Sequence, residues 1–88
     1  MHKFNAGQLV YTRGVAALEL PIEQLLGLLA RHLAGDWGDV CAEDVQANDT
    51  AVERGFRILS SYKVGQVTIW IITEWDRSVT TFLLPEEY

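Results

Sequence analysis

The pattern of hydrophobic and polar positions predicts that the last third of the chain is extended. Residues 57–84 are rich in β-branched and aromatic side chains, and two turn sequences, Lys63-Val64-Gly65 and Trp75-Asp76-Arg77, interrupt them. Such side chains fit the half-buried surface of a pleated sheet. We therefore predict three consecutive antiparallel strands, at about residues 56–62, 66–74 and 78–84.

A helical period precedes these strands. Between residues 21 and 33, leucine and isoleucine recur every three or four positions and form a broad apolar stripe: Ile22, Leu25, Leu26, Leu29 and Leu33. Gly35 is a suitable stop. A second helix is predicted at residues 42–54, where acids crowd the first turns and favour the positive end of the helix dipole. We also predict a short strand at residues 8–12 and one or two helical turns at residues 15–20.

These elements give the order β-α-α-β-β-β. A chain of 88 residues is one domain, residues 1–88, with one modest core. Helices must cover one face of the sheet. The expected fold class is α+β, an antiparallel sheet of three to four strands with the helices packed on one face.

The middle predicted strand is apolar on both of its faces. Val67, Ile69 and Ile71 point to one side, while Trp70 and Ile72 point to the other. Two short helices can shield only one side, so we predict that a second copy of the chain, or another protein, covers the other. The alternative is a twisted sheet with a few exposed apolar residues, which is ordinary for a protein surface.

The charge balance narrows the choice of partner. Net charge is −5, with seven basic and twelve acidic residues. Between Asp36 and Asp49 the chain carries Asp36, Asp39, Glu43, Asp44 and Asp49, and no base. Nucleic-acid binding depends on Lys and Arg at phosphates, so this balance argues against it. The acidic segment can attract a basic partner or can simply be a solvated face.

Other broad features exclude several classes. A single cysteine, Cys41, allows no internal disulfide and no multi-cysteine metal site. No apolar run reaches the ~20 residues that span a bilayer, and residues 1–10 lack the apolar segment of a secretory signal. We therefore expect a cytoplasmic protein with no membrane association, no cofactor and no metal.

Two isolated residues are candidates for chemistry. His32 precedes Asp36 by four positions, and such a pair can act as a general base or as half of a metal site. The alternative is a partly buried histidine that closes the helix C-terminus, where its charge is favourable. Cys41 precedes a helix, which lowers a thiol pKa, but the nearby acids oppose this, and a structural role is favoured.

The last predicted hairpin holds the most suggestive polar group. It comprises Glu74, Asp76, Arg77, Ser78, Thr80 and Thr81, and Arg57 and Tyr62 on the neighbouring strand can join it. A carboxylate, an arginine and hydroxyls can supply a base, a phosphate clamp and positioning donors. Alternatively, Arg57 and Arg77 pair with Glu74 and Asp76 across the strands, and the threonines are present for β propensity.

Aromatic residues mark a candidate binding surface. Trp75 lies at a turn and is the best candidate for an exposed contact, while Trp70 fits a core or an interface. The predicted binding residues are Trp75, Trp70, Tyr62, Asp76, Arg77 and Thr81. A small-ligand pocket lined by Trp70 and Tyr62 is a further hypothesis.

Several segments resemble a group of short bacterial proteins carried on plasmids and other mobile elements. The segments are Gly35-Asp36-Trp37-Gly38, RILSSY at 57–62, WIITE at 70–74, DRS at 76–78 followed by Thr80-Thr81, and LLPEEY at 83–88. The resemblance covers most of the chain. It implies an origin on a mobile element and carries no activity with it.

The order of elements and the string WIITEWDRSVTTFLL are also similar to the barnase and RelE-toxin ribonucleases. This resemblance implies Glu74 as base and Arg57 or Arg77 as phosphate clamp, with His32 as a further candidate. The barnase group places a histidine in the last hairpin turn and is basic, whereas this turn holds Asp76 and Arg77 and this chain is acidic. Fold likeness alone does not carry function.

The hypothesis that follows is a non-enzymatic protein-interaction domain, homodimeric, that binds an unidentified protein. The alternative is a ribonuclease or toxin-type enzyme that uses Glu74, Arg57, Arg77 and His32.

Overall fold

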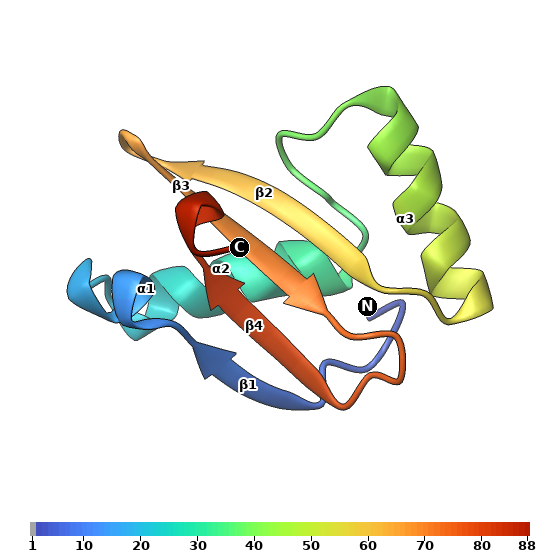
Figure 1. Ribbon diagram of the computed structural model, residues 1–88, viewed down its shortest axis with the longest axis horizontal. Helices are drawn as coiled ribbons and strands as arrows, with labels where there is room; N and C mark the ends of the chain where they lie inside the picture. The colour runs from blue at the N-terminus through green and yellow to red at the C-terminus, as the bar shows by residue number, and fades with distance from the viewer. Residues whose placement is uncertain (1) are drawn as a thin grey trace.

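A computed structural model of the protein describes residues 2–88. The elements follow the order β1 (Gln8–Tyr11), α1 (Arg13–Ala17), α2 (Ile22–Leu33), α3 (Ala42–Arg54), β2 (Ile58–Val64), β3 (Val67–Thr73), β4 (Val79–Leu83) and a final 3₁₀ turn, η1 (Pro85–Glu87). Figure 1 shows the four strands side by side, with α2 behind them and α3 beside β2. The α+β class predicted from the sequence is confirmed.

The sheet is mixed, which corrects the prediction of an antiparallel sheet. Its strand order is β1-β4-β3-β2, and the pairs β2–β3 and β3–β4 are antiparallel as predicted. β1 instead runs parallel to β4, with Leu9 level with Thr80 and Tyr11 with Phe82. Gly7 makes this approach possible, since a Cβ on it would lie 2.4 Å from the Arg77 carbonyl oxygen.

Helix α2 packs on one face of the sheet and forms the larger core. Its residues Leu28, Leu29 and Leu33 meet side chains from the three C-terminal strands, namely Tyr62, Ile69, Ile71 and Phe82, and Val15 of α1 joins them. The buried side of α2 differs from the predicted stripe. Leu28 and His32 are buried, whereas Ile22 and Leu26 are 61% and 48% exposed.

Helix α3 lies at the β2 edge and covers part of it (Figure 1). Ala51 packs with Trp37 and Ile58 in a second small core. The Asn48 side chain donates to the Leu59 carbonyl at 2.8 Å and accepts from the Leu59 N–H at 3.3 Å. The preceding loop pairs with Ser61, whose N–H donates to Trp37 and whose carbonyl accepts from Asp39. These backbone groups of β2 therefore offer nothing to another strand.

The second face of the sheet, opposite α2, is partly covered by the chain's own C-terminal end. Tyr88 packs edge-on against Trp70, with ring centroids 5.6 Å apart. Ile72 and Leu83, which lie on this face by strand alternation, are each only 5% exposed. Figure 1 shows η1 lying in front of the sheet on this side. The apolar surface that suggested a partner on this face is thus smaller than the sequence indicated.

Candidate functional site

His32 lies in the core and is fully buried. Its Nδ1 is 2.5 Å from the Ser60 hydroxyl and its Nε2 is 2.8 Å from the Thr73 hydroxyl. Thr73 is in turn 2.7 Å from Thr80, and the Thr80 hydroxyl donates to the Ala6 carbonyl at 2.6 Å. This polar chain crosses the sheet from α2 to the segment before β1.

The Ala6 carbonyl, at one end of this series of hydrogen bonds, determines which group donates at each step. Thr80 uses its only proton on the carbonyl of Ala6, so Thr73 must donate to Thr80. Thr73 then accepts from Nε2–H of His32, and Nδ1 accepts from Ser60. Burial, and to a smaller extent the charge of Arg77, lowers the pKa of His32 to about 4. The ring is therefore neutral near pH 7 and closed to any substrate.

Arg77 supports the backbone of the last hairpin. It adopts a left-handed conformation, with φ of 59°. Its guanidinium donates to the carbonyls of Phe56 at 2.7 Å, Glu74 at 3.0 Å and Ala51 at 2.8 Å, and it lies over the Phe4 ring. Burial lowers the pKa of Arg77, and the three carbonyls compensate for the water that the cation loses. The side chain has little left for a phosphate.

The other candidates from the last hairpin are engaged separately. Arg57 lies over the Tyr88 ring and donates to its hydroxyl, on the face opposite His32. Asp76 accepts from the N–H of Ser78 at 3.1 Å and from its hydroxyl at 2.6 Å, and these bonds lower the pKa of the Asp76 carboxyl. The predicted ion pairs of Glu74 and Asp76 with arginines do not appear among residues 2–88.

The fold does not gather the predicted catalytic residues. His32 is sealed in the core, Arg57 is on the second face and Arg77 is bound to carbonyls near the end of α3. Glu74 is partly buried next to the Arg77 turn. A base and a phosphate clamp around one cleft, which the ribonuclease hypothesis requires, are therefore not assembled.

The predicted binding residues also lie apart. Tyr62 is 1% exposed, and its hydroxyl donates to the Asp36 carbonyl at 2.7 Å. Trp70 and Thr81 are half-buried on the second face. Trp75 is 66% exposed at the tip of the last hairpin. No pocket described for residues 2–88 combines Trp70 with Tyr62.

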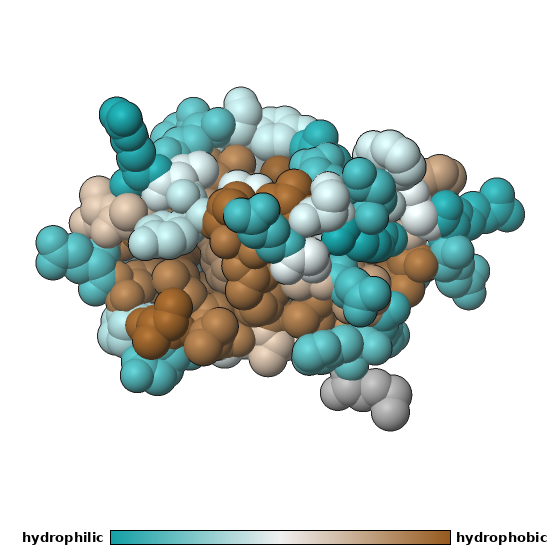
Figure 2. All heavy atoms as spheres, turned by 90° about the horizontal axis from the view of Figure 1, so that it is seen from below, coloured by the Kyte–Doolittle hydropathy of each residue, from teal (hydrophilic) through white to brown (hydrophobic). Residues whose placement is uncertain are grey.

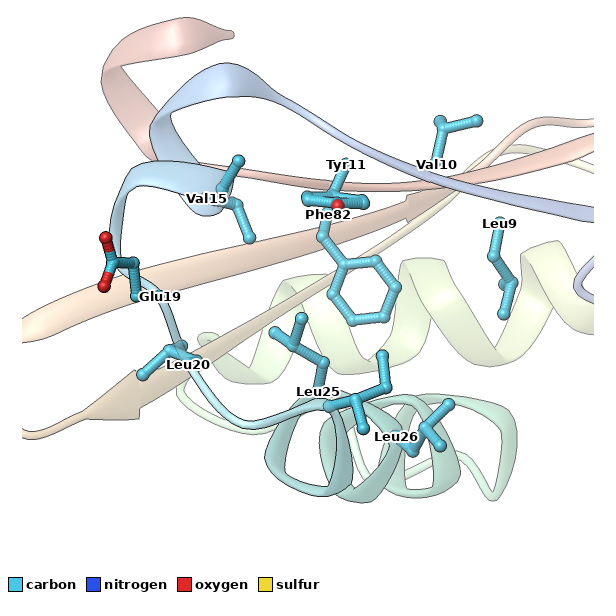
Figure 3. A pocket seen from close by; sticks show the side chains of 11 residues that line it. Leu9, Val10, Tyr11, Val15, Glu19, Leu20, Leu25, Leu26 and Phe82 are labelled. Atoms are coloured by element: carbon cyan, nitrogen blue, oxygen red, sulfur yellow. The ribbon is translucent and has the colours of Figure 1, made fainter.

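An apolar concave surface lies elsewhere, between β1 and the start of α2. We call it the β1 hollow. It has a volume of about 420 Å³, and β1, α1, α2 and β4 contribute to its lining, which includes Leu9, Tyr11, Val15, Leu25, Leu26 and Phe82. Glu19 is the one ionisable carboxylate among the described lining residues. Figure 3 shows Leu9 pointing down toward Leu26, with the Phe82 ring between Tyr11 and Leu25, while Val10 points the opposite way.

An unusual amount of apolar surface is exposed around this hollow. Leu9 is 45%, Tyr11 61%, Ile22 61% and Leu26 48% exposed. Figure 2 views the side of the molecule that carries β1 and shows hydrophobic side chains gathered there. Single exposed apolar residues are common, but a contiguous group on a small protein usually marks an interaction surface.

The backbone beside the hollow is unpaired. Gln8 donates to the Ser78 carbonyl and Thr12 to the Phe82 carbonyl, each at 3.0 Å. The residue between them that shares this side of the strand, Val10, also faces β4 in the parallel register. The N–H and C=O groups of Leu9 and Tyr11 therefore point outward, and no other strand of residues 2–88 lies beyond them.

A second hollow, near Tyr62, is polar and internally neutralised. It lies beside Arg31, Asp36, Asp39 and Lys63. Arg31 pairs with Asp36 at 2.7 Å, and Lys63 lies 3.7 Å from Asp39. The Arg31 guanidinium holds the pKa of the Asp36 carboxyl below its usual value. Since each charge has a partner, this hollow presents no strong field to an ion.

Comparisons with known proteins add no assignment. No protein-family model, no curated protein and no solved structure matches the chain. Within residues 2–88, no three His, Cys, Asp or Glu side chains are grouped to hold a metal ion. No described helix is long and apolar enough to cross a membrane. The geometry of the β1 hollow is thus the main guide to function.

Proposed function

We propose that the protein is a non-enzymatic interaction module that binds an extended, hydrophobic segment of a protein at β1. The observation that carries this proposal is the coincidence of an unpaired strand edge with an apolar hollow on the same side of the sheet. An added strand would bond to Leu9 and Tyr11 through its backbone, which gives affinity. Alternate side chains of that strand would enter the hollow, which gives selectivity.

The chemistry of the hollow favours binding over catalysis. Its described lining is almost entirely aliphatic and aromatic, and the Glu19 carboxylate and the Tyr11 hydroxyl are the polar side-chain groups in it. No Ser, Cys, His or Lys side chain is among the described lining residues. A buried Leu or Ile side chain of a ligand contributes about 1.5–3 kcal/mol, so one or two such anchors suffice for a specific, reversible complex.

The two edges of the sheet differ in whether their outward backbone groups have partners. At the β2 edge, Asn48 and the Trp37–Asp39 loop occupy the outward backbone groups of Leu59 and Ser61. Proteins commonly block edge strands in this way to avoid unwanted pairing. The β1 edge carries no such block among the described residues, and its neighbouring side chains are large and apolar. This contrast supports a docking role for β1.

Peptide display tests the proposal. A random peptide library is selected on the wild-type protein and, in parallel, on Leu26→Glu, which places a carboxylate in the hollow. We expect enriched peptides with hydrophobic residues at alternate positions, and at least tenfold weaker binding to Leu26→Glu. Trp75→Ala is the matched control, because it removes a large exposed side chain away from the hollow. Peptides that bind Leu26→Glu and wild type equally would refute the proposal.

A further inference from the structure

The β1 edge is self-complementary. Its outward backbone groups belong to Leu9 and Tyr11, which stand on either side of Val10. If a second β1 runs antiparallel with Val10 opposite Val10, Leu9 of each copy lies opposite Tyr11 of the other. Each such pair exchanges two bonds, so the register satisfies the outward groups of both copies with about four backbone hydrogen bonds.

The same register joins the exposed side chains. Figure 3 shows Leu9 pointing to the α2 side and Val10 pointing away from it. Tyr11, two positions after Leu9, shares the face of Leu9 by strand alternation. In antiparallel pairing they form two cross-strand Leu–Tyr contacts, of the aromatic–aliphatic kind that stabilises sheets. Ile22 and Leu26, exposed at the rim of the hollow, flank those contacts. We infer that the β1 hollow is occupied by a second copy of this chain, which makes one continuous eight-stranded sheet.

Charge favours this edge over others for a chain of net charge −5. The acids between Asp36 and Asp49 lie in and before α3, beside β2, at the far end of the strand order. Three strand spacings separate β1 from β2, roughly 14 Å. This exceeds the Debye length of about 8 Å at physiological ionic strength, so the acidic segments of two copies are screened from each other. Near β1 the charges are mixed: Arg13 is basic, and Glu19 and Glu87, whose carboxylate accepts from Thr12 and Gly14, are acidic.

The exposed area suits a weak to moderate dimer. Four large side chains, each between 45% and 61% exposed, surround the hollow. They amount to roughly 400 Å² of apolar surface, a size of patch that is often functional on a monomer. This is about half of the ~800 Å² per partner that a standard interface buries, so the strand backbone and the rim must supply the rest. The inference rests on the proposed function, since it names the occupant of the same hollow.

Hydrogen exchange gives a residue-level test. In the monomer, the N–H groups of Leu9 and Tyr11 are open to water, whereas that of Val10 is bonded to β4. On raising the protein concentration from micromolar to millimolar, we expect the Leu9 and Tyr11 amides to become at least tenfold slower in exchange. The Val10 amide is the internal control and is slow throughout. Exchange at Leu9 and Tyr11 that is independent of concentration would overturn the inference.

Sedimentation of variants separates this edge from other contacts. Leu9→Pro removes an outward N–H and leaves the bonds to β4 in place, as proline is tolerated on such an edge. Tyr11→Glu places a carboxylate opposite the apolar Leu9 and serves if Leu9→Pro does not fold. We expect a wild-type dimer, a folded monomer for either variant, and a dimer for the control Trp75→Ala. A folded variant that is as dimeric as wild type would place the contact elsewhere and refute the inference.

The outcomes distinguish the inference from the proposed function. A wild-type protein that is monomeric up to millimolar concentration, yet binds selected peptides in the hollow, refutes the second copy and retains the interaction module. A monomer that selects no peptides refutes both. A third outcome supports both the second copy and the interaction module. In it, wild type is a dimer, Leu9→Pro is a monomer, and the monomeric variant Tyr11→Glu binds no selected peptides, because the same surface then binds the second copy and the peptides.

Discussion

The Nε2 atom of His32 lies 2.8 Å from the Thr73 hydroxyl oxygen, and both side chains are fully buried. This bond joins α2 to the central strand β3 through the core. Because Thr73 passes its own proton to Thr80, His32 must hold its proton on Nε2. The imidazole is thus a structural crosslink that works only when it is neutral.

Acidification should weaken the fold through this imidazole. The pKa of His32 falls from 6.5 to about 4 on folding. The folded-state value is the lower one, so below pH ~6.5 the unfolded chain binds a proton that the native chain refuses. We expect the free energy of unfolding to fall as the pH drops from 6.5 to about 4, by roughly 3 kcal/mol at most. Urea denaturation at a series of pH values measures it.

A control separates the two histidines. His2→Gln should keep the same dependence of stability on pH, since His2 is exposed. Carboxylates whose pKa is lowered, such as those of Asp36 and Asp76, lose their contribution only at more acidic pH. A stability that is flat between pH 6.5 and 4.5 would contradict the buried neutral imidazole.

Thr73→Val should destabilise the protein by about 1–3 kcal/mol. The substitution keeps the shape of the side chain but leaves the Nε2–H group of His32 buried without an acceptor. Thr81→Val is the matched control, because Thr81 is the residue next to Thr80, the interstrand partner of Thr73, and therefore faces the other side of the sheet. Chemical denaturation compares the two variants. Equal and small effects would show that the polar chain contributes little.

Arg77→Met should lower stability by more than Arg57→Met. Arg77 holds three carbonyls, including that of Ala51 near the end of α3, and each bond to a charged group contributes about 1.5–3 kcal/mol. Arg57 contacts the C-terminal Tyr88 at the surface, where such contacts contribute roughly 0–1 kcal/mol. Thermal denaturation ranks the two. Arg57→Met as the more damaging change would contradict the assigned roles.

Asn48→Leu should open the β2 edge. The N–H and C=O of Leu59 would lose their side-chain partners, at a cost of about 1–3 kcal/mol, and an edge strand would become available for aggregation. Gln46→Leu on the same helix is the control for added hydrophobicity, since Gln46 is exposed and makes no such contact. Light scattering on heating should rise earlier for Asn48→Leu. The same onset for both variants would argue against the edge-blocking role.

Local patterns predicted the long elements well. Helix α2 begins one residue after its predicted start and ends where the leucine spacing stops, and α3 matches its predicted bounds. The hairpins follow because turn residues separate runs of β-branched side chains. The direction and partner of β1 did not follow, because a four-residue strand carries no information about either. Its pairing with β4 is set by contacts between the two ends of the chain.

The site was harder to predict because solvent exposure is a tertiary property. Leu26 belongs to the apolar stripe of α2 by spacing, but the sheet stops at β1 and leaves it uncovered. The alternative interpretation of His32 as a structural histidine agrees with its burial, but the ring is neutral and not a charge at the helix end. Its two hydroxyl partners, Ser60 and Thr73, come from strands far along the chain. Nothing in the sequence marked Arg77 as a support for carbonyls of three separate segments.

The unequal edges of the sheet limit how large an assembly can become. Among the described residues, Asn48 and the Trp37–Asp39 loop block the β2 edge at Leu59 and Ser61, and β1 leaves the other edge available. A subunit with one open edge and one blocked edge cannot polymerise by strand addition, because the first strand that pairs with β1 uses the only open edge among the described strands. A higher protein concentration therefore pairs more of the open β1 edges but does not produce fibres. This limit lets a small protein expose apolar side chains to water without aggregating.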